Sequence, residues 1–417
     1  MERRPLHIVF LTHYFPPEGN APATRVLALA RRWVAQGCRV TVVTGVPNVP
    51  DGKVYDGYRN KLWQIEEVAG IKVVRVWTFV AANRGTARRV ANYLSFMAAA
   101  AVAGCLVKKS DVVLATSPQF FCGWAGAFVG RLRHLPFILE IRDIWPEAIV
   151  AVGAIRRGRL VAFLEWLERR LYASADYIVT VGEGYRQKLR EHGVPSAKIA
   201  VAMNGIDREG CHAPVAGMGI RRQYGLEGKF VCSYVGTVGL ACGLEVVLRA
   251  AALLKTRADQ DVVFLIVGDG ATLGQLKEAA RRRGLENVIF TGLQPKTLIT
   301  EFLAASDACL VHLKKQELFR SVMPSKIFEA LAMSRPIILG VEGVAADFLR
   351  ASASGLCIEP ENENDLLLAI ERLRRDLALA QSLGRNGRDY VLKHFDWDTL
   401  ADSYLQQIHS VLKTVKS

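Results

Sequence analysis

Short apolar segments that alternate with helical stretches are the feature of this sequence that most restricts its fold. In the first half, six such segments have the length and composition of buried β-strands. They cover residues 6–12, 39–44, 73–76, 112–115, 137–140 and 177–181. Because a strand, a helix and a second strand in succession form a parallel pair with a right-handed crossover, the alternation predicts a doubly wound α/β sheet.

The same alternation begins again near residue 205. Strands are expected at residues 230–235, 262–267, 288–290, 308–312 and 336–339, and a last helix at about 397–415. A chain of 417 residues is long enough for two such domains with full-sized cores. We therefore expect two Rossmann-like α/β domains that face a cleft, residues 1–205 and 206–385, followed by a C-terminal helical segment, residues 386–417.

The charge of the chain restricts its partners. The formal net charge of +14 predicts affinity for anions, which include nucleic acid, anionic lipid headgroups and phosphorylated substrates. Runs that interleave basic with aromatic residues are absent, so nucleic acid is not expected as a partner. The eight cysteines form neither a C-x-x-C pair nor a cluster with histidine at metal-ligand spacing. They are interpreted as reduced thiols of a cytoplasmic protein that holds no metal or other resident cofactor.

Residues 90–107 are 18 residues without a charge, and basic residues flank them on both sides. Their alanine content, together with Asn92, Ser95 and Gly104, argues against a membrane span. One interpretation is a helix buried in the core. The other is a helix that lies in the membrane interface and contacts lipid or a lipid-linked acceptor, which the basic flanks and the overall charge favour.

Two glycine-rich loops follow expected strands of the second half. Residues 268–270 (GDG) begin like a dinucleotide fingerprint, but Leu273 stands at the third position, where glycine or alanine is needed, so a dehydrogenase is not expected. The segment is either a tight strand-to-helix turn or a turn that lets a nucleotide lie close to the backbone. Residues 236–243 (GTVGLACG) form the second loop, where backbone N–H groups can approach a phosphate.

The segment 319–332 is the strongest local candidate for a binding site. It follows an expected strand and opens a helix, and Pro324 suits the first helical turn. A diphosphate would gain from the free N–H groups at the helix start and from Lys326, and Glu329 could accept hydrogen bonds from a ribose. The alternative is a capped helix with a solvated lysine and glutamate.

Polar residues also follow the strands of the first half that are expected to be central. Residues 143–147 (DIWPE) join an acid, an aromatic residue and a helix-starting proline. They are either a helix cap with an anchoring tryptophan or a wall of the cleft that contacts the donor sugar or the acceptor. The D-x-D triplets at 259–261 and 396–398 are not expected to bind metal, because the first precedes its strand and the second lies at a helix start.

These segments together resemble glycosyltransferase family 4, a group of retaining enzymes with the GT-B fold, and within it the WbuB-type transferases of bacterial surface-polysaccharide synthesis. The resemblance covers nearly the whole chain. It rests on residues 13–18 (HYFPPE), 44–50 (TGVPNVP), 143–147, 236–245, 268–270, and 324–326 (PSK) with Glu329.

The resemblance implies that the second domain binds a nucleotide-sugar donor, that the first binds the acceptor, and that the last helix crosses back onto the first domain. Glu329 matches the second glutamate of the family's E-x7-E motif, which holds the donor ribose. Ser321 stands where the family has the first glutamate. The arginine and lysine common after the glycine loop are also missing, so Lys326, helped by Arg320, is the expected partner of the diphosphate.

The expected site therefore has three groups of residues and no metal ligand. The residues expected to be catalytic are Asp143, Lys326 and Glu329. The residues expected at the donor are Gly236, Thr237, Gly239, Gly268, Gly270, Leu293, Arg320, Ser321, Pro324, Ser325, Lys326 and Glu329. The residues expected on the acceptor side are His13, Glu18, Gly19, Asn20, Arg142 and Trp145.

The expected function is retaining transfer of a sugar from a nucleotide donor to a lipid-linked saccharide, in the synthesis of O-antigen, capsule or exopolysaccharide. The family suggests UDP as the nucleotide, and the WbuB-type resemblance suggests an N-acetylated deoxyhexose. The protein is expected in the cytoplasm, peripherally bound to the anionic inner membrane. Two alternatives stay open: a nucleotide-sugar epimerase of the same fold, and a catalytically silent, membrane-docked assembly subunit.

Overall fold

The computed structural model describes residues 4–49, 52–81, 86–117, 120–153, 155–208 and 217–416. The chain divides into two compact units, one made of Met1–Asn204 and Trp397–Ser417 and the other of Gly205–Asp396. The expected connection between the halves falls mostly on residues 209–216, which lie outside the described residues, as does Pro50 of the family motif.

The first unit contains an eight-stranded sheet in the order β3-β4-β2-β1-β5-β6-β7-β8. Every pair of neighbouring strands is parallel except β3 and β4, which are antiparallel at one edge. All residues of β1, β5 and β6 are buried, as expected for strands covered on both faces. The strands are β1 (His7–Leu11), β2 (Arg39–Gly45), β3 (Trp63–Val68), β4 (Ile71–Val76), β5 (Val112–Thr116), β6 (Phe137–Ile141), β7 (Tyr177–Thr180) and β8 (Ile199–Val201).

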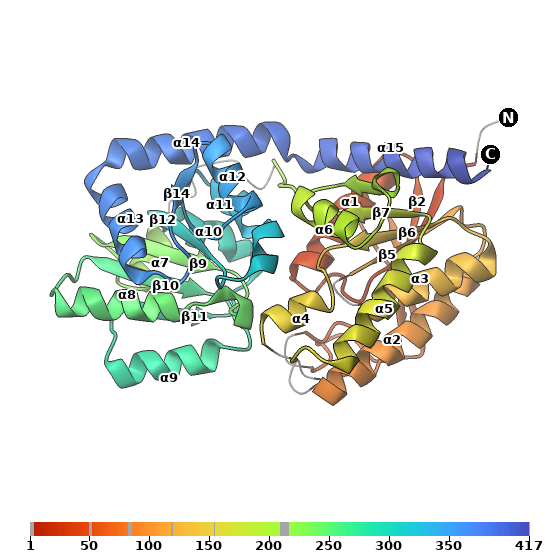
Figure 1. The fold of residues 1–417 in the computed structure, drawn as a ribbon, viewed down its shortest axis with the longest axis horizontal. Helices are drawn as coiled ribbons and strands as arrows, with labels where there is room; N and C mark the ends of the chain where they lie inside the picture. The colour runs from red at the N-terminus through yellow and green to blue at the C-terminus, as the bar shows by residue number, and fades with distance from the viewer. Residues whose placement is uncertain are drawn as a thin grey trace. The chain divides into compact units, whose positions relative to one another are not determined.

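The last helix of the chain packs on the first unit, beside its first helix (Figure 1). The Trp33 indole N–H donates to the Ala401 carbonyl at 3.0 Å, and the Trp33 and Tyr404 rings meet edge to face. The predicted return of the terminal helix is therefore confirmed. The helices of this unit are α1 (Ala21–Ala35), α2 (Thr86–Leu106), α3 (Phe120–Arg133), α4 (Glu147–Ala151), α5 (Arg159–Ser174), α6 (Glu183–Glu191) and α15 (Trp397–Lys416).

The second unit contains a six-stranded sheet in the order β11-β10-β9-β12-β13-β14, and all of its strand pairs are parallel. The strands are β9 (Phe230–Val235), β10 (Val262–Val267), β11 (Val288–Gly292), β12 (Ala308–His312), β13 (Ile337–Gly340) and β14 (Gly355–Cys357). The helices are α7 (Met218–Gln223), α8 (Glu245–Thr256), α9 (Leu273–Arg283), α10 (Ile299–Ala304), α11 (Lys326–Ala332), α12 (Val344–Ala351), α13 (Glu363–Arg375) and α14 (Leu377–His394).

Both predicted Rossmann-like sheets are present. The structure differs from the prediction in a domain boundary, in its edge strands and in the start of one helix. Residues 386–394, predicted as part of the terminal segment, complete α14 of the second unit. The edge strands β3, β8 and β14 were not predicted, because β3 lacks a buried strand's continuous apolar run and β8 and β14 are each only three residues long. Helix α11 begins at Lys326, two residues later than the position of Pro324 suggested.

Candidate active site

Two glycine loops of the second unit pack directly on each other. The Gly236 N–H donates to the Val267 carbonyl and the Val238 N–H to the Asp269 carbonyl, both at 2.9 Å. Gly268 has a φ of 136°, and a Cβ there would lie 2.0 Å from the Gly236 carbonyl oxygen. A Cβ at Gly270 would lie 2.4 Å from the Val238 oxygen. The chain's own backbone therefore accounts for both glycines, and the tight-turn interpretation describes this loop.

Polar contacts with side chains of β9 and β12 hold the loop at residues 236–243. The Tyr234 hydroxyl donates to the Thr237 carbonyl at 2.6 Å and lies 2.9 Å from the Cys242 Sγ. His312 Nε2 accepts the Glu361 N–H at 2.8 Å, so its Nδ1 carries the proton and donates to the Cys242 carbonyl at 2.7 Å. Within the described residues, the Thr237 and Gly239 N–H groups make no hydrogen bond and can receive an anion.

Lys326 lies beside this loop. Its Nζ lies 3.7 Å from the centroid of the Tyr234 ring, and a Cβ on Gly236 would meet that Nζ at 3.1 Å. Burial lowers the pKa of Lys326 to about 8, although the charges of Cys242 and Glu329 oppose the shift. Within the described part of the chain Lys326 forms no ion pair, so its charge is compensated mainly by the ring.

The residues before Lys326 are positioned differently from the prediction. Ser321 ends a short 3-10 helix, Glu317–Ser321, and its buried hydroxyl donates to the Leu318 carbonyl at 2.7 Å. It therefore supports the turn and does not point to a ligand. Arg320 is half exposed and its Nη1 lies 3.4 Å from Glu342, so this carboxylate would compete with a bound anion for the guanidinium. Pro324 and Ser325 precede α11, whose seven residues give it only a small dipole.

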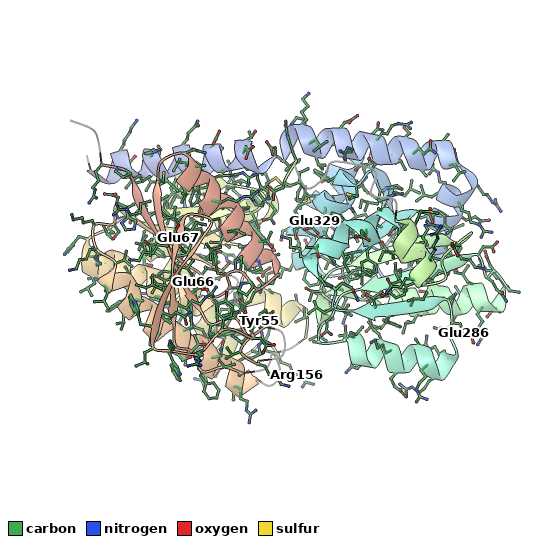
Figure 2. All side chains as sticks on the ribbon, turned by 180° about the vertical axis from the view of Figure 1, so that it is seen from behind. Tyr55, Glu66, Glu67, Arg156, Glu286 and Glu329 are labelled. Carbon is green, nitrogen blue, oxygen red and sulfur yellow. The ribbon has the colours of Figure 1, made fainter. Side chains whose placement is uncertain are left out.

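Glu329 and Leu293 present exposed side chains near this loop system. Glu329 projects from α11 (Figure 2), one turn beyond Lys326. Desolvation raises the pKa of its carboxyl, and the charges of Lys296 and Lys326 act in the opposite direction. Leu293 follows β11 and is 64% exposed, an apolar surface that a base could cover. Tyr234 and Lys296 were not predicted, because Tyr234 reads as one more strand residue and Lys296 as a loop residue.

Asp143 and Arg142 follow β6 at the carboxyl edge of the first sheet. The Tyr185 hydroxyl donates to Asp143 Oδ1 at 3.3 Å, and burial raises the pKa of this carboxyl. Burial lowers the pKa of Arg142 to about 10, with the charge of Glu140 acting in the opposite direction. The Nε and Nη1 atoms of Arg142 are buried and have no hydrogen-bond partner within the described residues, so they could donate to an anionic group.

A buried ion pair that the sequence did not reveal lies behind this edge. Arg25 donates to Glu140 Oε2 through Nε at 3.1 Å and Nη2 at 3.0 Å, and Thr116 donates to Oε1 at 2.8 Å. Burial alone would raise the pKa of Glu140, but the charges of Arg25 and Arg142 hold it below its ordinary value. Arg25 also donates to the Ala202 carbonyl at 2.7 Å and so fixes the chain just after β8.

The predicted acceptor residues of the first loop are largely engaged within the fold. The His13 ring stacks between Tyr14 and Phe96 at centroid distances of 4.7 and 4.6 Å, and burial lowers its pKa to about 3. Glu18 accepts the Asn48 and Val49 N–H groups at 3.0 and 3.2 Å. Burial raises the pKa of Glu18 to about 7. Glu18 therefore joins two neighbouring loops, whereas His13 packs against α2 and is neutral at physiological pH.

Of the other predicted acceptor residues, Asn20 and Trp145 make contacts within the fold, and nothing closely approaches Gly19. Asn20 caps α1, and its Oδ1 accepts the Ala23 N–H at 3.0 Å. Trp145 stacks on Phe120 with ring centroids 4.4 Å apart, which is the anchoring interpretation. A Cβ on Gly19 would meet nothing within 4 Å, so no close approach requires glycine there.

Both D-x-D triplets form ion pairs with arginines. Arg374 bridges Asp259 and Asp261 at 2.8 and 3.0 Å, and Arg32 lies 2.5 Å from Asp398. These contacts give the three carboxylates partners within the fold.

Helix α2 contains most of the charge-free segment. Ala87–Leu106 has the length and composition of a membrane span, with a mean hydropathy of 1.3, yet only 28% of its window is buried. Val90, Leu94, Val102 and Leu106 face outward and are 39 to 61% exposed. Helix α2 is therefore buried along one face only, which contains Phe96 and Ala100, and its exposed face is apolar.

Two Rossmann-like units, the second with a glycine loop beside a partly buried lysine, define a glycosyltransferase of the GT-B class. Residues 20–205 match the family described as glycosyl transferase 4-like domain, and residues 219–390 match glycosyl transferases group 1. The chain belongs to glycosyltransferase family 4, and the protein is a glycosyltransferase.

Curated relatives and solved structures agree with this assignment. The chain is 25% identical over 389 residues to the putative colanic acid biosynthesis glycosyl transferase WcaI of Escherichia coli K12, covering 90% of this chain and 93% of WcaI. It is 25% identical to O-antigen chain mannosyltransferase C of Escherichia coli, over 62% of this chain and 67% of that protein.

Sucrose-phosphate synthase from Thermosynechococcus elongatus shares the fold, with a TM-score of 0.76 and 18% identity over 98% of this chain and 100% of that one. HepE of Anabaena, solved with UDP and glucose, has a TM-score of 0.72 and 18% identity over 97% and 99%. At these identities the two structures establish the fold alone.

Proposed function

We propose that this protein transfers a sugar, with retention of configuration, from a UDP-sugar to a lipid-linked saccharide in the synthesis of a bacterial surface polysaccharide. The names of WcaI and of O-antigen chain mannosyltransferase C support the pathway class. HepE, which was solved with UDP and with UDP-glucose, supports the choice of nucleotide.

The observation that carries the proposal is Lys326. A partly buried lysine without an ion pair in the described residues is costly to keep, and a bound diphosphate would supply the missing anion. The Thr237 and Gly239 N–H groups of the adjacent loop offer two more donors to the same phosphates. The glycine at position 236 leaves room for the lysine next to this loop.

The remaining donor contacts follow from the positions of two side chains. Glu329 is exposed one turn along α11 and can accept hydrogen bonds from the ribose hydroxyls. Leu293 offers an apolar surface after β11 to the base. Because the Ser321 hydroxyl is held by Leu318, the sugar's own hydroxyls must find contacts other than the family's first glutamate.

In the chemical step, the bond from the anomeric carbon to the diphosphate breaks and negative charge develops on the departing UDP. Lys326 in its ammonium form and the two loop N–H groups are placed to stabilise that charge in the transition state. The acceptor hydroxyl must lose its proton, and the phosphate oxygen left by the breaking bond can take it on the same face of the sugar, which gives retention. We propose that no metal is needed for this charge compensation.

We also propose that the first unit contacts the cytoplasmic face of the inner membrane. Helix α2, whose exposed face is apolar, packs beside α3, and α3 packs beside α5 (Figure 1). On α3, Phe128 and Leu132 are 54% and 59% exposed, and on α5 Phe163 is 53% exposed. Exposed apolar residues on three adjacent helices, in a chain of net charge +14, favour an anionic bilayer as the partner.

The test follows sugar transfer to a polyprenyl-diphosphate-linked sugar by NMR, with a panel of UDP-sugars. We expect a product whose anomeric configuration matches the donor and a loss of transfer in Lys326→Met and Glu329→Gln. Lys277→Met, an exposed lysine on α9, is the control and should retain the wild-type rate. Inversion of configuration, donor conversion without acceptor, or full activity of both site variants would contradict the proposal.

A further inference from the structure

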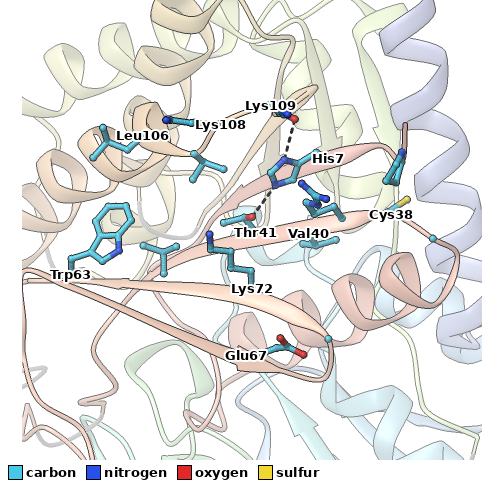
Figure 3. A pocket seen from close by; sticks show the side chains of 16 residues that line it. His7, Cys38, Val40, Thr41, Trp63, Glu67, Lys72, Leu106, Lys108 and Lys109 are labelled. Carbon is cyan, nitrogen blue, oxygen red and sulfur yellow. Dashed lines mark hydrogen bonds between the residues drawn. The ribbon is translucent and has the colours of Figure 1, made fainter. Parts of the chain in front are cut away.

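A hollow lies in the first unit at the opposite edge of the sheet from Asp143. It has a volume of about 740 Å³ and opens at the amino ends of β1, β2 and β4, beside the end of α2 (Figure 3). His7 forms part of its floor, where Nε2 meets the Thr41 hydroxyl at 2.9 Å and Nδ1 meets the Lys109 carbonyl at 3.1 Å. Since β1 is five residues long, the His7 end of the hollow lies roughly 15 Å from the sheet edge that carries the predicted acceptor residues.

The lining of this hollow is strongly basic. Arg39, Lys72, Lys108 and Lys109 contribute four cations, whereas Glu67 contributes the single carboxylate. None of the four cations forms an ion pair within the part of the chain that the structure describes. Unpaired cations around a concave surface concentrate anions and bind a phosphate group readily.

One wall of the hollow is apolar and continues into the exposed face of α2. Trp63 and Leu106 line the hollow and are 39% and 60% exposed. Val102 lies one turn before Leu106 on the same face of α2 and is 61% exposed. A ligand that fills this site therefore meets positive charge at one end and an apolar track leading away from it.

We propose that the hollow is a binding site for the headgroup of an anionic phospholipid. The phosphate lies among Lys72, Lys108 and Lys109, and the acyl chains run along Leu106 and Val102 toward the bilayer. This inference extends the membrane contact proposed above by naming its ligand, and it does not depend on the identity of the transferred sugar. A second copy of this chain is a poorer occupant, because it would bring another basic surface against these cations.

The experiment measures sedimentation of the full-length protein with vesicles of phosphatidylcholine alone and of phosphatidylcholine with about 30% phosphatidylglycerol. The site variant removes three charges from the hollow. The control variant removes three charges from α9 in the second unit. A third variant makes the exposed face of α2 polar. The variants are Lys72→Gln/Lys108→Gln/Lys109→Gln, Arg281→Gln/Arg282→Gln/Arg283→Gln and Leu94→Ser/Val102→Ser.

We expect the site variant to bind phosphatidylglycerol vesicles on the order of 100-fold more weakly than the wild type, since each of the three lysines at an anionic surface contributes roughly fivefold. The control should lose little, and UDP affinity should be unchanged in both. The α2 variant should bind both kinds of vesicle more weakly, whereas the site variant should bind neutral vesicles as the wild type does. These two results together would show that α2 contacts the bilayer and that the hollow binds the anionic headgroup.

Three results would overturn the proposal. Equal binding of phosphatidylglycerol vesicles by the site and control variants would show that only net charge matters and would leave the α2 contact intact. Tight binding of soluble glycerol phosphate without vesicle binding would show a site for a free phosphate ester. Absence of wild-type binding to any vesicle would remove this site together with the membrane contact proposed for α2.

Discussion

Replacing Lys326 with methionine should make the second unit more stable while it weakens the protein's function. Methionine has a similar length and can cover the Tyr234 ring without bringing a charge into the site. We expect stability and function to change in opposite directions because Lys326 is charged and partly buried, and it has no ion pair in the described residues. A lysine with a purely structural role would give the reverse result.

The size of the effect follows from the pKa of Lys326, which is about 8 in the folded protein against an ordinary value of 10.5. At about 1.4 kcal/mol for each tenfold change in proton affinity, holding the ammonium in place costs the folded state about 3 kcal/mol at neutral pH. Because the folded pKa is the lower one, the unfolded chain binds more protons between about pH 8 and 10.5, and wild-type stability rises across that window. The advantage of Lys326→Met should shrink to under about 1 kcal/mol near pH 10.

The assay is urea unfolding followed by two signals. All the tryptophans of the chain lie in the first unit, so tryptophan fluorescence follows that unit, whereas far-ultraviolet circular dichroism follows both. Lys326→Met should move the circular dichroism midpoint upward at pH 7 and leave the fluorescence midpoint in place if the units unfold separately. Lys277→Met on α9 is the control and should change neither signal.

Two outcomes would refute this reasoning. Destabilisation by Lys326→Met at pH 7 would show that the ammonium is favourably placed in the unliganded protein. A stabilisation that stays the same from pH 7 to pH 10 would show that packing, and not the buried charge, produces it.

Three further predictions concern the donor site and the two cores. UDP affinity should fall above about pH 8, by roughly 30-fold at pH 9.5 in calorimetry, because the free Lys326 must regain its proton; an affinity independent of pH would contradict this. Gly268→Ala should destabilise the second unit by about 3 kcal/mol, since the new Cβ would lie 2.0 Å from a backbone oxygen. The control is Gly274→Ala on α9, where a Cβ meets nothing within 4 Å, and it should be neutral or stabilising by up to about 1 kcal/mol. Arg25→Met should lower the tryptophan-detected stability of the first unit by about 3–5 kcal/mol by leaving Glu140 charged and unpaired, and a loss under about 1 kcal/mol would show that the pair is dispensable.

The sequence predicted the buried elements of this fold well. The strands at 230–235, 262–267 and 308–312 match β9, β10 and β12 in full, because a strand buried on both faces reads as a continuous apolar run. The edge strand β3 escaped prediction because half of its residues are polar and the adjacent Glu66 and Glu67 break a strict alternation. The edge strands β8 and β14 escaped prediction because each is only three residues long.

The candidate site was predicted less completely than the fold, and the reasons are physical. Lys326 and Thr237 could be singled out because they stand near glycine and proline signals. The Arg25–Glu140 pair could not be predicted because its residues lie far apart in the chain. The contacts of Tyr234 could not be predicted because the strand pattern already explains a tyrosine at that position. The acceptor role of Glu18 stays a prediction, and its hydrogen bond from the Asn48 N–H in a neighbouring loop could not be predicted because the two residues lie 30 positions apart.

Calorimetric titration of UDP and UMP into the wild type and Lys326→Met is the most direct test of the central claim, that Lys326 and the glycine loop hold the donor diphosphate. The wild type should bind UDP more tightly than UMP. Lys326→Met should weaken UDP by about 1.5–3 kcal/mol, or roughly 10- to 150-fold, and so remove most of the difference between the two nucleotides. Equal UDP affinity in the wild type and in Lys326→Met would contradict the account.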